Sequence, residues 1–168
     1  MPDSSARLTA GSLRPTCVSG DRNMPQKITQ GFRALVDAAE REVENLSVED
    51  ALKLHGRDDV VFVDLRDPRE LNREGRMPGA FHCTRGMLEF WIDPESPYHK
   101  PVFAQDKKFV FFCAGGWRSA LAAQTAQRMG LKPVAHVRGG FGGWKKAGGP
   151  VDMPDQESGI RKQESGSR

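Results

Sequence analysis

Two short apolar runs limit the folds open to this chain more than any other feature of its sequence. Residues 60–63 read Val-Val-Phe-Val and residues 109–113 read Phe-Val-Phe-Phe-Cys, with no charged residue in either run. A strand with one exposed face alternates apolar and polar residues, whereas a strand covered on both faces does not. Both runs therefore predict parallel strands buried under helices. Shorter strands are expected at residues 81–83 and 134–137.

Segments with helical spacing lie between these runs. Apolar residues recur every three or four positions over about residues 28–45, which predicts a leading helix. The sequence Ser-Val-Glu-Asp at residues 47–50 is typical of a capping box, so a second helix is expected to begin there and to end at Gly56. A longer helix is expected over residues 118–129. Strands that alternate with helices predict an α/β fold with a parallel sheet.

The length of 168 residues is that of one ordinary domain, which we expect to occupy residues 27–151. The segments at residues 1–26 and 152–168 are polar and aperiodic, so a disordered N-terminal extension and a disordered C-terminal tail are predicted. Met24 stands just before the first organised segment. Residues 1–23 could therefore lie outside the native protein, and a mitochondrial presequence is a further interpretation.

Composition excludes several classes of protein. No run of about 18 apolar residues is present, so no membrane-spanning helix is expected. No basic stretch followed by an apolar core opens the chain, so no secretory signal is expected either. Three cysteines are an odd number and too few for a disulfide scaffold. They favour a reducing compartment, and we expect a cytoplasmic protein.

Charge is unevenly distributed along the chain. Residues 100–150 carry nine Lys or Arg residues and one acidic residue, Asp106, while the whole chain has a formal net charge of +3. Such a basic half could attract a small anion, or its side chains could simply be solvated. A nucleic-acid-binding face is not expected, because there is no Lys/Arg run and little aromatic interleaving.

The segment that carries chemistry follows the second apolar run. Cys113 ends that run, Gly115 and Gly116 follow it, and Arg118 stands at the start of a helix. Ligand sites in parallel sheets lie at the carboxyl ends of strands, and glycines before a helix let backbone N–H groups converge on one point. A thiol at that point is favoured as the thiolate. The pattern predicts a nucleophilic cysteine in an anion-binding loop; the alternative is a small buried residue that ends a strand.

This loop and three other segments resemble the rhodanese (thiosulfate:cyanide sulfurtransferase) family. Residues 113–118, Cys-Ala-Gly-Gly-Trp-Arg, are similar to that family's CxxGxR active-site loop. The other landmarks are Phe-Val-Asp-Leu-Arg at residues 62–66, Gly-Arg-Met-Pro-Gly-Ala at residues 75–80, and Gly-Gly-Phe-Gly-Gly-Trp at residues 139–144. The resemblance covers about residues 46–151. It implies a compact single rhodanese-like domain, in which helices flank a five-stranded parallel sheet.

The resemblance also implies a mechanism. The Cys113 thiolate would attack the sulfane sulfur of a small anionic donor such as thiosulfate and keep it as a persulfide. Cyanide or a thiol, or an unidentified protein acceptor, would then take the outer sulfur. Arg118 would steady the loop and the anion. Backbone N–H groups of the loop would hold the persulfide, which involves Ala114, Gly115, Gly116, Trp117 and Ser119. No metal or organic cofactor is implied, and neither nucleic acid nor membrane is expected as a partner.

Further positions receive a role from the same resemblance. Asp64 and Arg66 match an Asp and an Arg near the family's pocket, with a structural ion pair as the alternative; that alternative is preferred for Asp64 and left open for Arg66. Trp117 is expected to form a wall of the pocket rather than to cap the next helix. Ala114 and Gly115 are uncharged where thiosulfate-binding members often carry basic residues, which predicts weak thiosulfate binding.

Other functions are less well supported by the sequence. A rhodanese-like regulatory or docking module is the main alternative, although such modules usually lack the cysteine. A cysteine phosphatase of similar fold needs Cys-x5-Arg, whereas the sixth residue after Cys113 is Ser119. Residues 139–143 lack the spacing of a dinucleotide site. The histidines are scattered without metal-ligand spacing; they are His55, His82, His99 and His136.

Two further cysteines lie outside this loop. Cys83 is expected near the pocket rim, where it could convert a persulfide into a disulfide; the alternative is a structural thiol. Cys17 falls in the predicted extension and is expected to be incidental.

Overall fold

The computed structural model describes residues 26–154, so the predictions for residues 1–25, Cys17 among them, and for residues 155–168 lie outside the described part. All five strands run parallel, in the order β1-β5-β4-β2-β3. Their bounds are β1 Glu44–Leu46, β2 Val60–Asp64, β3 Phe81–His82, β4 Lys108–Phe112 and β5 Val134–Val137. The α/β fold with a five-stranded parallel sheet is therefore confirmed.

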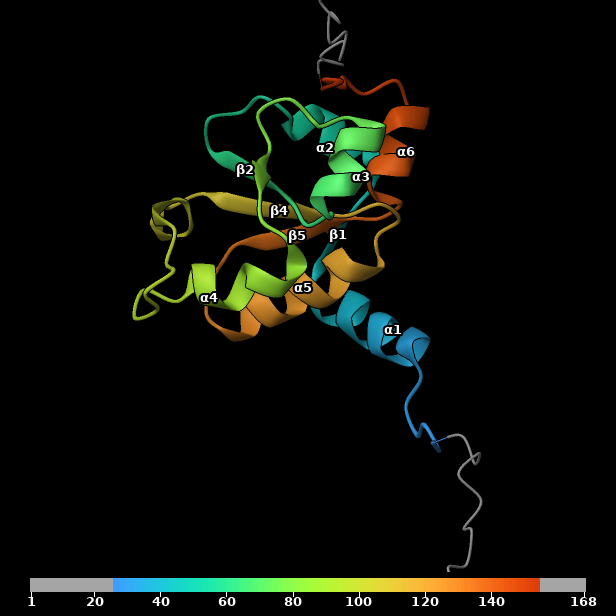
Figure 1. The fold of residues 1–168 in the computed structure, drawn as a ribbon, viewed down its shortest axis with the longest axis vertical. Coiled ribbons are helices and arrows are strands. Elements are labelled where there is room, and N and C mark those ends of the chain that lie inside the picture. Colours follow the sequence, from blue (N-terminus) through green and yellow to red (C-terminus); the bar gives the residue numbers. More distant parts are fainter. Residues whose placement is uncertain (1–25, 155–168) are drawn as a thin grey trace, which may run out of the picture.

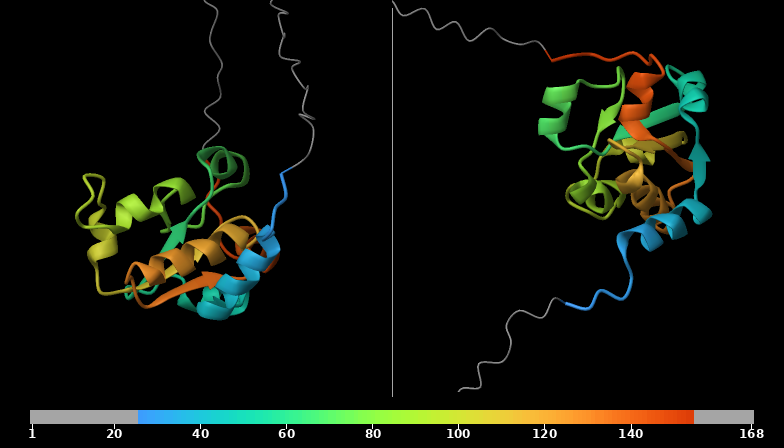
Figure 2. Two further views of the ribbon diagram at one scale, coloured as in Figure 1. Left: turned by 90° about the horizontal axis from the view of Figure 1, so that it is seen from below. Right: turned by 90° about the vertical axis from the view of Figure 1, so that its right-hand side faces the viewer.

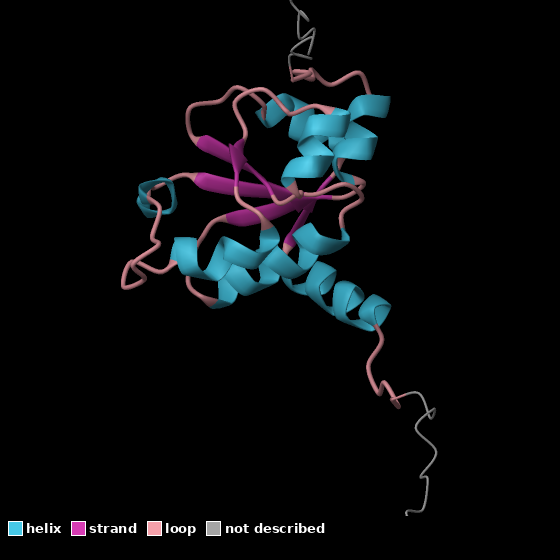
Figure 3. Ribbon diagram, viewed as in Figure 1, coloured by secondary structure: helices cyan, strands magenta, loops and turns pink. Residues whose placement is uncertain are grey.

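Helices cover both faces of this sheet (Figures 1 and 3). The helices α1 Phe32–Glu42, α4 Leu88–Ile92 and α5 Trp117–Arg128 lie on one face. The other face carries α2 Val48–Leu54, α3 Pro68–Glu74 and α6 Gly140–Lys146. Two short 3-10 helices, η1 Arg85–Met87 and η2 Pro101–Ala104, complete the connection between β3 and β4. Figure 2 shows α1 side by side with α5.

The central strand β4 explains the unbroken apolar run. Phe109 and Phe111 belong to the apolar core on the side of α4 and α5, whereas Val110 and Phe112 belong to the core on the side of α2 and α6. All four side chains are buried. Successive side chains of a strand point to opposite faces, so a strand between two helix layers has no position for a polar residue.

The leading helix is shorter than the predicted residues 28–45. It begins at Phe32 and ends at Glu42, and residues 44–46 form β1, the strand that sequence patterning missed. Val43 and Leu46 are three positions apart, a spacing that fits one face of a helix. In the structure their side chains are buried in different cores, on opposite faces of the sheet. The helical spacing was therefore misleading at this end.

The folded part also extends past residue 151 at the other end. Asp152 and Arg76 exchange two backbone hydrogen bonds, with N–O distances of 2.8 and 2.9 Å. Val151 packs against the core under α2 and α6. The described structure therefore continues at least one residue past the predicted boundary at residue 151, through a backbone pairing that does not depend on side-chain polarity.

Ion pairs connect the basic half of the chain to glutamates that precede it. Five basic residues of the segment 100–150 lie within 2.7–3.4 Å of glutamate carboxylates. The pairs are Lys108–Glu44, Arg118–Glu70, Arg128–Glu42, Arg138–Glu40 and Lys145–Glu74. Much of the uneven charge is thus balanced inside the fold. Among residues 26–154, no helix has both the length and the apolar character needed to cross a bilayer.

Candidate active site

Cys113 lies directly after β4, at the carboxyl edge of the sheet, and is 2% exposed. The chain turns at Gly116, whose φ of 107° is a left-handed conformation that favours glycine. This turn directs the Gly116 N–H at the Cys113 Sγ, with a donor–sulfur distance of 3.1 Å. Helix α5 begins at the next residue, so its positive end also faces the sulfur. The arrangement favours negative charge on Cys113 Sγ.

The glycine-rich segment before α6 packs against the back of this loop. The Phe141 N–H donates to the Cys113 carbonyl at 2.7 Å, and the Gly142 N–H donates to the Ala114 carbonyl at 3.0 Å. Gly140 has a φ of 56°, and a Cβ placed on it would overlap the Cys113 carbonyl oxygen. Glycine is therefore required here for close approach. The glycine-rich motif at residues 139–144 therefore holds the cysteine loop in place.

A pocket of about 380 Å³ opens at the cysteine; it is lined by Cys113, Ala114, Gly115, Trp117 and Arg118. Trp117 lies at its edge with 54% of its surface exposed. The indole packs on Phe32 of α1 with a centroid distance of 4.9 Å, and the Arg33 guanidinium lies 5.6 Å from the indole ring. This position is that of a pocket wall, and it joins the wall to α1.

Arg118 is held by a carboxylate that the sequence analysis did not single out. Its two terminal nitrogens donate to the two Glu70 oxygens at 2.8 Å each. These hydrogen bonds raise the pKa of Arg118, and the nearby Cys113 adds to that increase. The same hydrogen bonds lower the pKa of Glu70 to about 2. Glu70 closes the capping box of α3 with Asp67. The Asp-x-x-Glu spacing could have identified that cap, but not the partnership with Arg118.

Asp64 and Arg66 lie in the interior and do not line the cysteine pocket. Arg66 Nη2 is 2.6 Å from Asp64 Oδ2 and donates a second hydrogen bond to the Gly75 carbonyl at 3.0 Å. The guanidinium also stacks 3.7 Å above the Phe141 ring. The geometry is that of a structural ion pair that joins the end of β2 to the turn at Gly75 and to α6.

Behind the sulfur lies a chain of polar side chains. The Ser119 Oγ is 3.7 Å from the Cys113 Sγ and donates to the Gly116 carbonyl at 3.0 Å. The same hydroxyl lies 3.3 Å from His136 Nδ1, and His136 Nε2 lies 2.7 Å from Asn45 Oδ1. Ser119 and His136 are buried. Sequence reasoning weighed His136 only as a metal ligand and missed its place behind the cysteine.

Cys83 is completely buried, and its Sγ contacts the Thr84 carbonyl at 3.7 Å. Burial raises the pKa of this thiol to about 12. Such a group stays in the thiol form near neutral pH and is a weak nucleophile. These observations favour a structural thiol over a partner for a persulfide.

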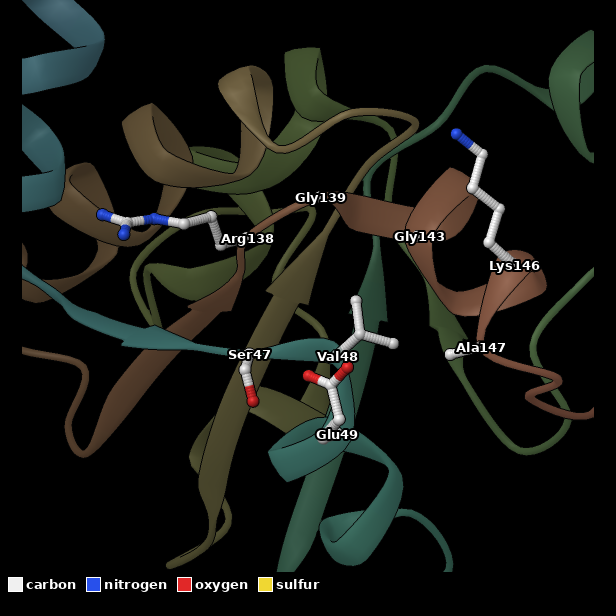
Figure 4. Close-up of a pocket in the computed structure, with 8 residues that line it drawn as sticks. All are labelled: Ser47, Val48, Glu49, Arg138, Gly139, Gly143, Lys146 and Ala147. Carbon is white, nitrogen blue, oxygen red and sulfur yellow. The ribbon is translucent and has the colours of Figure 1, made fainter.

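A separate hollow of about 530 Å³ lies between the start of α2 and the glycine-rich start of α6, and none of the cysteine-loop residues borders it (Figure 4). Arg138 at its margin is paired with Glu40 at 2.9 Å, and its side chain points away from the other labelled residues. Within residues 26–154, no group of three or more His, Cys, Asp or Glu side chains is placed to hold a metal ion.

Known proteins share this fold and parts of this sequence. Residues 47–147 match a family model described as the rhodanese-like domain. A thiosulfate sulfurtransferase GlpE of Glaesserella parasuis is 29% identical over 114 residues, which cover 68% of this chain and 97% of that protein. A sulfurtransferase of Allochromatium vinosum is 27% identical over 103 residues, covering 61% and 88%.

Two solved structures are also similar to this chain. A protein of unknown function and possible tyrosine phosphatase from Rhodopseudomonas palustris is 65% identical with a TM-score of 0.76, covering 77% of this chain and 99% of that one. The polysulfide-sulfur transferase homodimer of Wolinella succinogenes is 31% identical with a TM-score of 0.58, covering 76% and 90%.

Proposed function

This chain belongs to the rhodanese-like domain family, and from that membership and the geometry at Cys113 we propose that it is a sulfurtransferase that carries sulfane sulfur as a Cys113 persulfide. The observation that carries the proposal is the position of the sulfur. It lies at the end of a buried strand, 3.1 Å from a backbone N–H that points at it. Relatives at 27–31% identity that are sulfurtransferases support the same activity.

The proposed first half-reaction loads the enzyme. The Cys113 thiolate attacks the outer sulfur of a donor such as thiosulfate and forms a new S–S bond. The S–S bond of the donor breaks, and sulfite leaves with the electron pair. The Gly116 N–H and the positive end of α5 stabilise the charge that remains on the persulfide. Arg118, at the pocket wall, attracts the anionic donor, although Glu70 offsets part of its charge.

In the second half-reaction an acceptor removes the outer sulfur. A nucleophile such as cyanide or a thiolate attacks that sulfur from the open side of the pocket, and the bond to Cys113 Sγ breaks. The Cys113 thiolate leaves with the electron pair and returns to its first state. No redox cofactor takes part, because each step exchanges one nucleophile on sulfur for another.

The loop length weighs against the phosphatase alternative that the Rhodopseudomonas palustris protein suggests. A phosphate group needs a loop that surrounds a tetrahedral oxyanion. Here Arg118 follows Cys113 by five positions and is already bound to Glu70 through both terminal nitrogens. The short loop directs the Gly116 N–H at the sulfur atom itself, which suits a bound sulfur better than a bound phosphate.

Intact mass after incubation with thiosulfate tests the proposal. We expect the wild-type protein to gain the mass of one sulfur atom, to lose it on addition of cyanide and to release thiocyanate. Cys113→Ala should gain nothing, although the buried Cys83 is still present. If neither thiosulfate nor polysulfide adds mass, the proposal is wrong and a docking module is favoured. Hydrolysis of p-nitrophenyl phosphate that depends on Cys113 would instead favour the phosphatase.

A further inference from the structure

A continuous line of polar atoms connects Cys113 with the edge of the sheet. The Cys113 thiol is 3.7 Å from Ser119 Oγ, which is 3.3 Å from His136 Nδ1. On the far side of the imidazole, Nε2 lies 2.7 Å from Asn45 Oδ1. Ser119 belongs to α5, His136 to β5 and Asn45 to β1, so three separate elements build the line behind Cys113. Cys113, Ser119 and His136 are all buried, which leaves little access for water behind the sulfur.

The hydrogen bonds of Asn45 decide which nitrogen of His136 carries the proton. The Asn45 Nδ2 donates to the backbone carbonyls of Glu40 at 2.7 Å and Val43 at 3.1 Å. Its Oδ1 therefore faces the imidazole and must accept from Nε2–H. Burial lowers the pKa of His136, so the ring is neutral near neutral pH. In that form Nδ1 has a free lone pair, and this lone pair points at the Ser119 hydroxyl.

We propose that Ser119 passes the thiol proton of Cys113 to His136 Nδ1, so that the thiolate forms without a water molecule behind the sulfur. The use of this relay in sulfur transfer rests on the proposed function, whereas the arrangement of its atoms does not. The S–H bond breaks and leaves its electron pair on sulfur, while the proton binds Ser119 Oγ. The hydroxyl turns from the Gly116 carbonyl towards Nδ1 and gives up its own proton there. No oxidant or reductant is needed, and the reverse transfer restores the thiol.

Some charged groups around this line favour the charged forms of His136 and Cys113, and others oppose them. Glu40 of α1 lies 4.0 Å from His136 Nε2 and stabilises an imidazolium, but Arg138 binds Glu40 at 2.9 Å and opposes that effect. On the α5 side, Arg118 favours the thiolate, and Glu70 of α3 offsets part of its charge. The neighbour of His136 on β4 is Phe111, which is apolar. Burial beside an apolar side chain disfavours an imidazolium at this position, which favours return of the proton to the sulfur.

The pH dependence of Cys113 alkylation tests the relay without any sulfur transfer. The rate of reaction with iodoacetamide is measured from pH 5 to 10 in the full chain carrying Cys17→Ser, which removes the thiol outside the described residues. Cys83 serves as an internal control that should not react with iodoacetamide, because it is buried and its pKa is raised to about 12. Ser119→Ala removes the relay. His136→Asn keeps a hydrogen-bonding atom near the former Nδ1 but cannot accept a proton.

We expect both variants to react at least about tenfold more slowly than the parent near pH 7, because the relay accepts the proton as the sulfur attacks. Near pH 10 they should react at the parent rate, because hydroxide can accept that proton instead. Ser119→Thr, which keeps the hydroxyl, should restore most of the rate at pH 7. The relay is overturned if both profiles superimpose on the parent, or if the rate falls equally at pH 7 and pH 10, which indicates a distorted loop. Far-UV circular dichroism verifies that each variant is folded.

The same samples separate this inference from the proposed function. If the parent protein is alkylated with the expected profile but gains no sulfur from thiosulfate or polysulfide, the relay is supported and the sulfurtransferase proposal is wrong. If the parent protein gains sulfur but the variants show unchanged alkylation profiles, the activity is supported and the relay is wrong.

Discussion

Glu70 holds both terminal nitrogens of Arg118 at 2.8 Å and so joins α3 to the first turn of α5. The same carboxylate accepts the Asp67 N–H at 2.8 Å and closes the N-terminal cap of α3. One side chain thus completes a helix end and fixes the arginine of the cysteine loop. The wall of the pocket depends on a residue that does not itself line it.

Replacement of Glu70 by Gln is expected to destabilise the protein in a pH-dependent manner. The folded state lowers the pKa of Glu70 from 4.5 to about 2, so its stabilisation is complete above pH 4.5 and is lost as the pH falls towards 2. We expect Glu70→Gln to reduce the free energy of unfolding by about 1 kcal/mol at pH 7. Urea unfolding at several pH values between 2.5 and 7 measures the difference, which should shrink as the pH falls.

Glu49→Gln is the matched control for this change. Glu49 lies in the first turn of α2 and forms no ion pair with any residue of the described part, 26–154. Its replacement should cost little at any pH. A loss of stability for Glu70→Gln that stays constant from pH 7 to pH 2.5 would contradict the role given to the charge.

Gly140→Ala is expected to damage both stability and activity. A Cβ at this position would overlap the Cys113 carbonyl, and the φ of 56° already disfavours a side chain. We expect the free energy of unfolding to fall by at least about 2 kcal/mol, with a parallel loss of sulfur transfer. Gly115→Ala is the control, since no atom lies within 4 Å of its Cβ position and its φ is not positive. Equal effects of the two changes, measured by urea unfolding, would contradict this account of the motif.

Loop length is predicted to select the substrate. Insertion of one glycine between Gly116 and Trp117 gives Cys-x5-Arg and moves the start of α5 away from the sulfur. We expect sulfur transfer to fall at least about tenfold, because small displacements of reacting groups are costly. Weak inhibition by phosphate or arsenate should appear as the ring of N–H groups widens. A glycine inserted after Gly56, where the surroundings are open, controls for the insertion itself. Unchanged transfer would show that loop size does not select the substrate.

A positive charge at Ala114 is predicted to improve the use of thiosulfate. Ala114 lines the pocket and is half-buried, and no basic side chain of the loop precedes Arg118. An added exposed charge is worth about 0.2–1 kcal/mol, so Ala114→Arg should lower KM by up to roughly fivefold. The gain should shrink at high salt, because exposed charges are screened beyond about 8 Å at physiological ionic strength. Ala114→Gln controls for size, and steady-state kinetics at two salt concentrations that show no change in KM would refute the prediction.

Local features of the chain predicted most of the fold. The apolar runs identified β2 and β4, because a strand buried on both faces needs apolar residues at successive positions. The helix start at Ser47 was also correct, since the Ser47 Oγ accepts the Asp50 N–H at 3.1 Å; the Asp50 carboxylate accepts from the Ser47 hydroxyl and not from its N–H, as a capping box would require. The strand β1 was not predicted, because three residues are too few to show a period and their spacing continued that of α1.

The candidate site was predicted less completely, for a different reason. Cys113 and Arg118 lie in one loop, so their spacing is visible in the sequence. Glu70 is 48 positions from Arg118, and Asn45 is 91 positions from His136. Such partners meet only when the strand order β1-β5-β4-β2 is known, and no local pattern contains that order.

The range that matches the family model begins at residue 47, directly after β1 ends. A chain shortened to that range would lose the edge strand and leave the backbone N–H and C=O groups of β5 open along that side. Open edges of this kind recruit strands from other molecules and lead to aggregation. The segment before residue 47 therefore pairs with the outer side of β5, and the edge that remains is a strand of only three residues, which limits such addition.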